Sequence, residues 1–340
     1  MGVGPISFTD ACDLVRKIRS RSALSRIEEL CTRTLLRLPD ARDAESAVKG
    51  FLKEAAQIAI PSPGEFVKAP QEWVEGARLE LEGRRAGTGP VYYDLGLPDV
   101  TRAIAGERGH LVILAAETGK GKTALALNIA ANLAVDQAVP TLYVNTEMGW
   151  DELAIRLYAI LGEADLFALR TGQASDADMQ KVDGVYRILQ HANALYITDA
   201  MPWATIEDVS ALIREYVMLA SIEVVIVDYI QRFEDGFEGR ETWENLLKAT
   251  KRLKSLAQEL NILAFVVAQL NDQQHLAGAK GMAREADTLA YLEEDEERIG
   301  THRLRLVKAR HGPSGGVIRL LMDRKSLKFL EVVEEELDKG

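Results

Sequence analysis

The residues with the clearest chemical meaning form a turn rich in glycine and lysine. The turn reads Ala116-Glu117-Thr118-Gly119-Lys120-Gly121-Lys122-Thr123, after the apolar run LVILAA and before the helix-like run KTALALNIA. Glycine allows backbone N–H groups to turn inward, and the helix that follows adds the positive end of its dipole. A strand, such a turn and a helix are typical of the phosphate-binding loop G-x-x-x-x-G-K-[ST]. The turn therefore predicts a site for a nucleoside triphosphate.

Two side chains of this loop have specific expected roles. Lys122 would reach the β- and γ-phosphates of ATP, and Thr123 would offer its hydroxyl to Mg²⁺. The first position departs from the usual motif, because Ala116 stands where glycine is common. The alternative is a glycine-rich turn whose lysines are merely solvated, but the flanking strand and helix favour phosphate binding.

An aspartate at the end of another apolar run could provide a second ligand for Mg²⁺. Asp228 ends the run VVIVD, at the expected carboxyl end of a buried strand. A site that hydrolyses a triphosphate needs such an anchor beside the phosphate-binding loop. By itself, an aspartate in this place would more often cap the next turn, but the nearby phosphate-binding loop favours the magnesium role.

Two further polar residues follow apolar runs in the same way. Glu147 lies in TLYVNTEMGW and could orient or deprotonate the attacking water, or it could be a first-turn glutamate of the helix DELAIRLYAI. Gln269 ends AFVVAQ and could sense the γ-phosphate by hydrogen bonding, or it could only cap its strand. The sequence leaves both alternatives open.

The segments around these residues indicate how they are positioned. The apolar runs LVILAA, TLYVN, ALYITD, EVVIVD and LAFVVAQ alternate with helical stretches such as TWENLLKATKRLKSLAQEL. This alternation predicts an α/β fold with a mostly parallel sheet covered on both faces, whose ligands collect beyond the carboxyl ends of the strands. After HRLRLVKAR the strands follow one another without long helices, which predicts an antiparallel extension at one edge of the sheet.

The first part of the chain has a different character. DACDLVRKIRSRSALSRIEELCTRTLLRL and DAESAVKGFLKEAAQIA carry apolar residues at helical spacing, so we predict two helices joined by a turn. IPSPGEFVKAP breaks this pattern, and QEWVEGARLELEGRR predicts another helix. The expected domains are a helical region over 1–62, a linker with a helix over 63–90 and the α/β domain over 91–340.

Composition and charge exclude several classes of protein. The chain has no apolar run long enough for a bilayer and no signal peptide, and its two cysteines, Cys12 and Cys31, are too few for a disulfide framework. We therefore expect a cytoplasmic protein. The net charge of −11 argues against broad attraction to nucleic acid, although it leaves room for a local basic channel.

Several of these segments together resemble hexameric replicative helicases of the DnaB type. LVILAAETGKGKTALALNIA is similar to that family's phosphate-binding loop, including the alanine at its first position. Five later segments resemble the family's in the same order: VNTEMGWDELAIRLYA, LRTGQASDADMQKV, VVIVDYIQRF, VVAQLN and LVKARHGPSGGVIRL. The N-terminal helices resemble the family's helical hairpin, and Gln71–Arg84 resembles the linker helix that docks on a neighbouring subunit.

This resemblance implies a fold, an activity and roles for single residues. It implies a RecA-like core in a hexameric ring that hydrolyses ATP with Mg²⁺ at subunit boundaries, translocates 5′ to 3′ on single-stranded DNA and unwinds duplex. By the same resemblance Glu147 is the catalytic base, Asp228 the Walker B acid and Gln269 the sensor. Arg310 would be an arginine finger supplied to the neighbour's site, with Lys308 beside it, whereas without the resemblance both would be solvated residues of a strand end.

Two departures from the family pattern limit what the resemblance implies. Only 110 residues precede the first apolar run of the α/β domain, so the family's globular N-terminal subdomain looks absent, as in a phage or mobile-element version. That shortening puts the family's N-terminal collar and its contacts with primase in doubt. Ala277 and Gly278 stand where the family has an arginine and a glutamate near DNA, which leaves Lys280 and Gly281 as candidates for phosphate contacts or as part of a plain Gly/Ala-rich loop.

Two rival functions remain open on the sequence. A RecA-like recombinase or filament ATPase would share the phosphate-binding loop and the glutamate. A ring-forming scaffold or loader ATPase without unwinding activity would fit the altered segment after Gln269. A small-molecule kinase is a more distant alternative, because no lid or acceptor pocket is recognisable.

Overall fold

The protein is described by a computed structural model, which covers one main body of the chain. It describes residues 50, 69–86, 92–202, 204–230, 242–269, 277–298, 300–310, 312 and 315–332. The chain divides into two compact units, Met1–Pro70 and Gln71–Gly340, and nearly all described residues belong to the second. The predicted N-terminal hairpin falls outside the described residues, and the domain boundaries remain a prediction.

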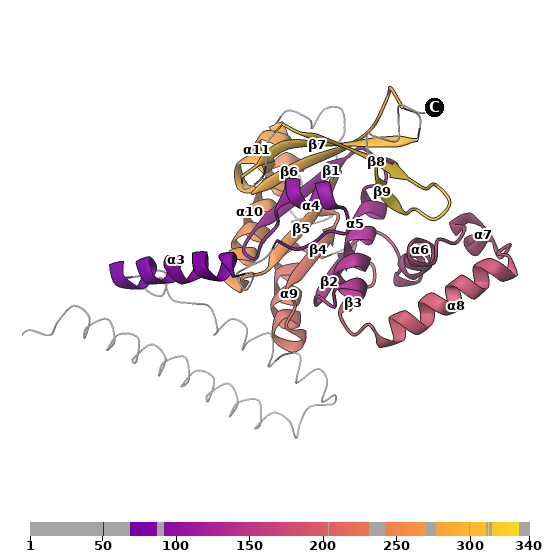
Figure 1. The fold of residues 1–340 in the computed structure, drawn as a ribbon, viewed down its shortest axis with the longest axis horizontal. Helices are drawn as coiled ribbons and strands as arrows, with labels where there is room; N and C mark the ends of the chain where they lie inside the picture. Colours follow the sequence, from indigo (N-terminus) through magenta and orange to yellow (C-terminus); the bar gives the residue numbers. More distant parts are fainter. Residues whose placement is uncertain are drawn as a thin grey trace, which may run out of the picture. The chain divides into compact units, whose positions relative to one another are not determined.

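One sheet forms the centre of the second unit, in the order β3-β2-β4-β5-β1-β6-β7-β8-β9 (Figure 1). The strands are β1 (Leu111–Ala116), β2 (Thr141–Asn145), β3 (Leu195–Ile197), β4 (Val224–Asp228), β5 (Leu263–Gln269), β6 (Thr288–Glu294), β7 (Thr301–Ala309), β8 (Val317–Met322) and β9 (Phe329–Glu331). Neighbouring strands from β3 to β6 are parallel, and those from β6 to β9 are antiparallel. The predicted α/β fold with an antiparallel extension is confirmed.

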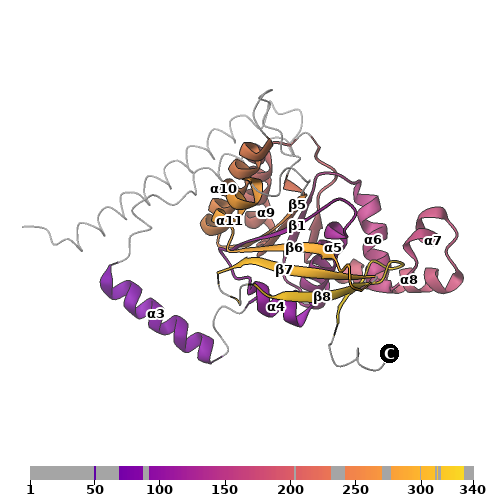
Figure 2. The same cartoon turned by 90° about the horizontal axis from the view of Figure 1, so that it is seen from above.

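Helices cover both faces of this sheet because the central strands are apolar on both sides. Every residue of β1, β2 and β4 is buried, as expected for covered parallel strands. Along β1, Val112 and Leu114 belong to one apolar cluster, whereas Leu111 and Ile113 belong to the other. The first cluster packs under α4, α5 and α6, and the second under α9, α10 and α11, which lie on the opposite face in Figure 2.

The helices predicted over QEWVEGARLELEGRR, KTALALNIA, DELAIRLYAI and TWENLLKATKRLKSLAQEL are present among those that the structure describes. The described helices are α3 (Pro70–Arg85), α4 (Pro98–Ile104), α5 (Lys122–Ala131) with its π-helical end η3 (Asn132–Asp136), α6 (Trp150–Gly162), α7 (Leu166–Thr171), α8 (Asp176–His191), α9 (Ile206–Ala220), α10 (Thr242–Leu260) and α11 (Ala277–Glu285). The expected helix over QEWVEGARLELEGRR is α3, which buries none of its residues. Among the described helices, none has the length and apolar character needed to cross a membrane.

Candidate active site

The predicted phosphate-binding loop connects β1 to α5 and has the backbone that its glycines suggest. Gly119 and Gly121 have φ values of +79° and +81°, in the left-handed region that glycine adopts without a steric penalty. A Cβ atom at Gly121 would lie 3.1 Å from the Met322 sulfur and 3.2 Å from the Phe329 ring, so the antiparallel extension packs directly against the loop. Lys122, the first residue of α5, is 8% exposed, and its ammonium lies 5.7 Å from the centre of the Tyr229 ring.

Asp228 ends β4 beside this loop and has one oxygen without a hydrogen-bond partner. The residue is 4% exposed. The Tyr143 hydroxyl donates to Oδ2 at 2.7 Å, and the Thr123 hydroxyl also hydrogen-bonds to this carboxyl group. Oδ1 is buried and unpartnered. Burial raises the pKa of Asp228 despite these two donors and the nearby Lys122.

A buried, unpartnered carboxylate oxygen is costly unless a cation occupies the position that it faces. Asp228 and Thr123 are both oxygen donors, the ligand type that Mg²⁺ prefers, and they are in contact with each other. The residues present therefore fit a magnesium ion held by Thr123 and Asp228. The alternative role of Asp228 as a simple turn cap does not account for the orphaned oxygen.

Glu147 follows β2, the strand that pairs with β4. Asn145, at the end of β2, is directly opposite Asp228. The Asn145 side-chain oxygen accepts hydrogen bonds from the backbone N–H of Glu147 at 3.2 Å and of Met148 at 3.1 Å, which fixes the turn. Glu147 is exposed, and its negative charge contributes to the raised pKa of Asp228. Because α6 begins only at Trp150, the alternative that Glu147 belongs to the first turn of this helix is wrong.

Gln269 is the last residue of β5, the strand next to β1. Its side-chain nitrogen donates a hydrogen bond of 2.7 Å to the hydroxyl of Thr118 in the phosphate-binding loop. The strand order therefore places the carboxyl ends of β1, β5, β4 and β2 side by side, in that spatial order, at one end of the sheet. Gln269 is therefore in contact with the loop whose ligand it was expected to sense.

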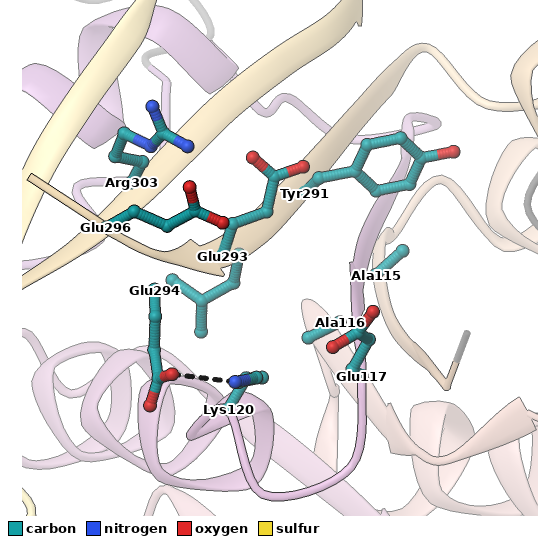
Figure 3. Close-up of a pocket in the computed structure, with 10 residues that line it drawn as sticks. Ala115, Ala116, Glu117, Lys120, Tyr291, Glu293, Glu294, Glu296 and Arg303 are labelled. Carbon is teal, nitrogen blue, oxygen red and sulfur yellow. Dashed lines mark hydrogen bonds and ion pairs between the residues drawn. The ribbon is translucent and has the colours of Figure 1, made fainter. Parts of the chain in front are cut away.

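The loop has a second neighbour that the sequence analysis did not identify. The Lys120 ammonium forms an ion pair of 2.7 Å with Glu294 at the end of β6, and this contact lowers the pKa of Glu294 (Figure 3). The pair lines a cavity of about 260 Å³ beside the loop. Other lining residues are Ala115, Ala116, Glu117, Tyr291, Leu292, Glu293, Glu296 and Arg303. No motif signals this contact, because it depends on β6 pairing with β1.

Arg310 and Lys308 lie at the opposite end of the sheet. Ala309 pairs with Thr288, which pairs with Val112 near the start of β1, whereas the phosphate-binding loop follows Ala116 at the other end. At about 3.3 Å per residue, the separation is at least ~13 Å, which is longer than an arginine side chain. Arg310 therefore lies far from its own chain's loop.

The two basic residues differ in their surroundings. The Arg310 side chain is 52% exposed and forms an ion pair of 3.0 Å with Asp287. The Lys308 ammonium donates to the carbonyls of Ala283 at 2.7 Å and Ala286 at 2.6 Å, at the end of α11. Burial, followed by the charge of Arg310, lowers the pKa of Lys308.

The candidate DNA contacts, Lys280 and Gly281, lie in helix α11. The alternative of a plain loop over these residues is therefore wrong. In an α-helix the N–H of Gly281 bonds to the carbonyl four residues earlier, so it is not available for a phosphate. A Cβ atom at Gly281 would lie 3.3 Å from Leu247 of α10, which gives this glycine a packing role. The side chain of Lys280 lies outside the described part.

Comparison with known proteins assigns the chain to a family. A family model described as the DnaB-like helicase C-terminal domain matches residues 94–331, more than half of the chain. The chain belongs to this family. A replicative DNA helicase DnaB from Haemophilus influenzae is 27% identical over 260 residues, which are 71% of this chain and 55% of the relative. The corresponding protein from Pasteurella multocida is 27% identical over 279 residues, which are 76% and 59% of the two chains.

Solved structures support the RecA-like fold of this DnaB-like domain. A solved ATPase domain has a TM-score of 0.68 at 19% identity and covers 76% of this chain and 99% of its own. A DnaB-like replicative helicase, described together with its interactions with primase, has a TM-score of 0.67 at 19% identity and covers 94% of this chain and 78% of its own. At this identity the similarity establishes the fold alone. The chain spans little more than half the length of the curated relatives it matches.

Proposed function

We propose that this chain is the ATP-hydrolysing motor of a replicative DNA helicase, which assembles as a hexameric ring, moves 5′ to 3′ along single-stranded DNA and unwinds duplex. One observation carries the proposal. The phosphate-binding loop, Asp228, Glu147 and Gln269 lie at the carboxyl ends of the parallel strands, whereas Arg310 lies at the opposite end of the sheet. Membership of the DnaB-like family supports the choice of DNA unwinding among the possible uses of ATP.

Each residue at the carboxyl ends of the parallel strands has its own role in ATP hydrolysis. Lys122 and the backbone N–H groups of the loop bind the phosphates of ATP, and Thr123 and Asp228 hold Mg²⁺. When bound, Mg²⁺ neutralises charge that develops on the phosphates during hydrolysis. Glu147 orients the attacking water and accepts its proton. Gln269, through its contact with Thr118, links the state of the γ-phosphate to β5 and to the segment that follows it.

Arg310 completes the site of a neighbouring subunit. It lies too far from its own loop to act there, and a guanidinium is well suited to stabilise the charge on a transferring phosphoryl group. A contact between the loop end of one sheet and the Arg310 end of the next is head-to-tail, and such contacts form a ring when the rotation from one subunit to the next closes. Lys308, anchored to the carbonyls of α11, supports the strand end that carries Arg310.

DNA and partner proteins are the remaining parts of the proposal. Lys280 is the candidate for DNA-backbone contact, because copies of one lysine around a pore make a locally positive channel in an acidic protein. The similarity to a helicase described with primase makes a primase, or a loader protein, the partner to test.

A forked-duplex unwinding assay with Lys122→Ala and Arg310→Ala tests the proposal. Each variant alone should lose unwinding and lower ATP hydrolysis by about 100-fold or more, because every site then lacks either the loop lysine or the arginine from the neighbouring subunit. Mixed rings of the two variants should recover part of the hydrolysis, because some boundaries join an intact loop to an intact Arg310.

Other outcomes would point to other functions. Hydrolysis by Arg310→Ala at the wild-type rate would contradict the shared site. Hydrolysis by the wild type that single-stranded DNA does not stimulate, without strand separation, would indicate a scaffold or loader ATPase. Open filaments in electron micrographs, in place of rings, would indicate a recombinase-like protein.

A further inference from the structure

A buried aspartate at the start of β6 joins Arg310 to the strand that carries the phosphate-binding loop. Asp287 is 1% exposed. Its Oδ1 accepts from the Arg310 guanidinium at 3.0 Å, and its Oδ2 accepts from the backbone N–H of Leu111 at 2.8 Å and from the Lys254 ammonium at 2.6 Å. Its backbone also bonds to both neighbours: its N–H donates to the Leu111 carbonyl, and its carbonyl accepts from the Arg310 N–H, each at 2.9 Å.

These contacts keep the carboxylate charged and in place. Burial by itself raises the pKa of Asp287, but the hydrogen bonds from Lys254 and Leu111, together with the charges of Lys254 and His110, outweigh it and lower the pKa. A buried acceptor with donors on both oxygens has little freedom to rotate. The position of the Arg310 guanidinium is therefore tied to the first residue of β1.

We propose that Asp287 is a positioning residue for Arg310, which orients this guanidinium toward the nucleotide of the neighbouring subunit. The inference rests on the proposed function, because it assumes that Arg310 acts across a subunit boundary. Asp287 binds one terminal nitrogen of Arg310, and the side chain is still 52% exposed, so N–H donors remain at the surface for an anion.

The orientation matters because an unrestrained arginine has many rotamers to lose when it meets the phosphate. Fixing the guanidinium in advance removes this entropic cost from the reaction step. A displacement of about 1 Å in such a group is enough to slow a reaction by ~100-fold. The defect caused by losing Asp287 should therefore appear at the neighbour's site and should leave the chain's own loop intact.

The test uses Asp287→Asn, which removes the charge, and Asp287→Glu, which keeps the charge and moves it. Each variant should lower kcat for ATP hydrolysis by about 10- to 100-fold, with the affinity for a fluorescent ADP analogue unchanged. Mixing either variant with Lys122→Ala should restore hydrolysis at boundaries that join the intact loop of one protomer to the intact Asp287–Arg310 pair of the other. A residue that only stabilised its own fold would not be rescued by mixing.

Glu259→Gln is the matched control, because Glu259, like Asp287, is a largely buried carboxylate that pairs with an arginine, here Arg214, between α9 and α10. This control should lose stability without losing kcat below its unfolding temperature.

Mixing of Arg310→Ala with Lys122→Ala is run in parallel. Rescue there but not with the Asp287 variants would overturn the positioning role alone, whereas no rescue in either mixture would overturn the shared site itself. If both Asp287 variants failed to give folded rings by circular dichroism and gel filtration, Asp287 would be assigned to stability and the proposal rejected.

Discussion

At the scale of single residues, Asp228 shows a conflict between folding and function. Its carboxylate is buried at the end of β4, burial raises its pKa, and its Oδ1 has no hydrogen-bond partner. Stability alone would favour a neutral or fully bonded side chain in this position. A carboxylate retained in such surroundings is typical of a site built for a cation.

Replacing Asp228 by asparagine should separate the two effects. Because the raised pKa means that the ionised form lowers stability at neutral pH, Asp228→Asn should unfold at the same temperature as the wild type or higher. ATP hydrolysis should fall by about 100-fold or more, because a magnesium ligand is lost. Thermal unfolding with and without Mg²⁺ is the measurement, and Mg²⁺ should stabilise the wild type more than the variant. Equal stabilisation of both proteins by Mg²⁺ would contradict this assignment.

At the scale of elements, the phosphate-binding loop is held by contacts from three directions. Gln269 of β5 bonds to Thr118, Glu294 of β6 pairs with Lys120, and the ends of β8 and β9 pack against Gly121. The loop is therefore not a free turn between β1 and α5. Its shape depends on strands that follow it by more than 140 residues in the chain.

The two glycines of the loop give a matched test of this packing. Both have φ near +80°, so an alanine at either position should cost about 1–2 kcal/mol of unfolding free energy. Gly121→Ala should cost roughly 1 kcal/mol more, because its Cβ would press on Met322 and Phe329, whereas nothing lies within 4 Å of a Cβ at Gly119. Urea unfolding of both variants measures the difference, and equal losses would show that the antiparallel strands do not restrain the loop.

At the scale of the whole molecule, the sheet separates two functional ends. The loop, Asp228, Glu147 and Gln269 lie beyond the carboxyl ends of parallel strands, and Arg310 lies at the opposite end, where Asp287 anchors it to β1. One rigid sheet thus spans the distance between the chain's own nucleotide site and the residue proposed to serve its neighbour.

Acid should weaken the whole domain partly through Asp287. Its pKa is lowered in the folded state, so its contribution to stability is present above the ordinary aspartate pKa of about 3.9 and is lost as pH falls through the lower folded value. Asp287→Asn should be less stable than the wild type at neutral pH, by about 3 kcal/mol, because Lys254 loses its buried partner. Below pH ~4 the wild type should lose stability more steeply than the variant. Urea unfolding across this pH range gives both curves, and parallel curves would remove Asp287 from the acid response.

The sequence by itself determined the order and type of most strands, and the residues at their carboxyl ends beside the phosphate-binding loop. The apolar runs that end in Ala116, Asn145, Asp228 and Gln269 are parallel strands of one sheet, because buried parallel strands have a strong local pattern and their carboxyl ends lie at the same end of the sheet. The helix α5 began directly after Gly121 as expected, since the glycine-rich turn and the helical run are both local signals.

Only the tertiary structure decided which residues far away in the chain contact β1 and the phosphate-binding loop. The pairing of β6 with β1 brought Glu294 to Lys120 and Asp287 to Leu111, and no local pattern encodes which strand pairs with which. It also decided that Glu147 precedes α6 and that Lys280 and Gly281 lie in a helix, against loop or first-turn alternatives that the sequence left open. The physical reason for the strand contacts is that residue type and spacing influence local conformation, whereas contacts between strands far apart in the chain depend on the packing of the whole sheet. The ends of helices are weak local signals, because they vary by one or two residues with the surrounding packing.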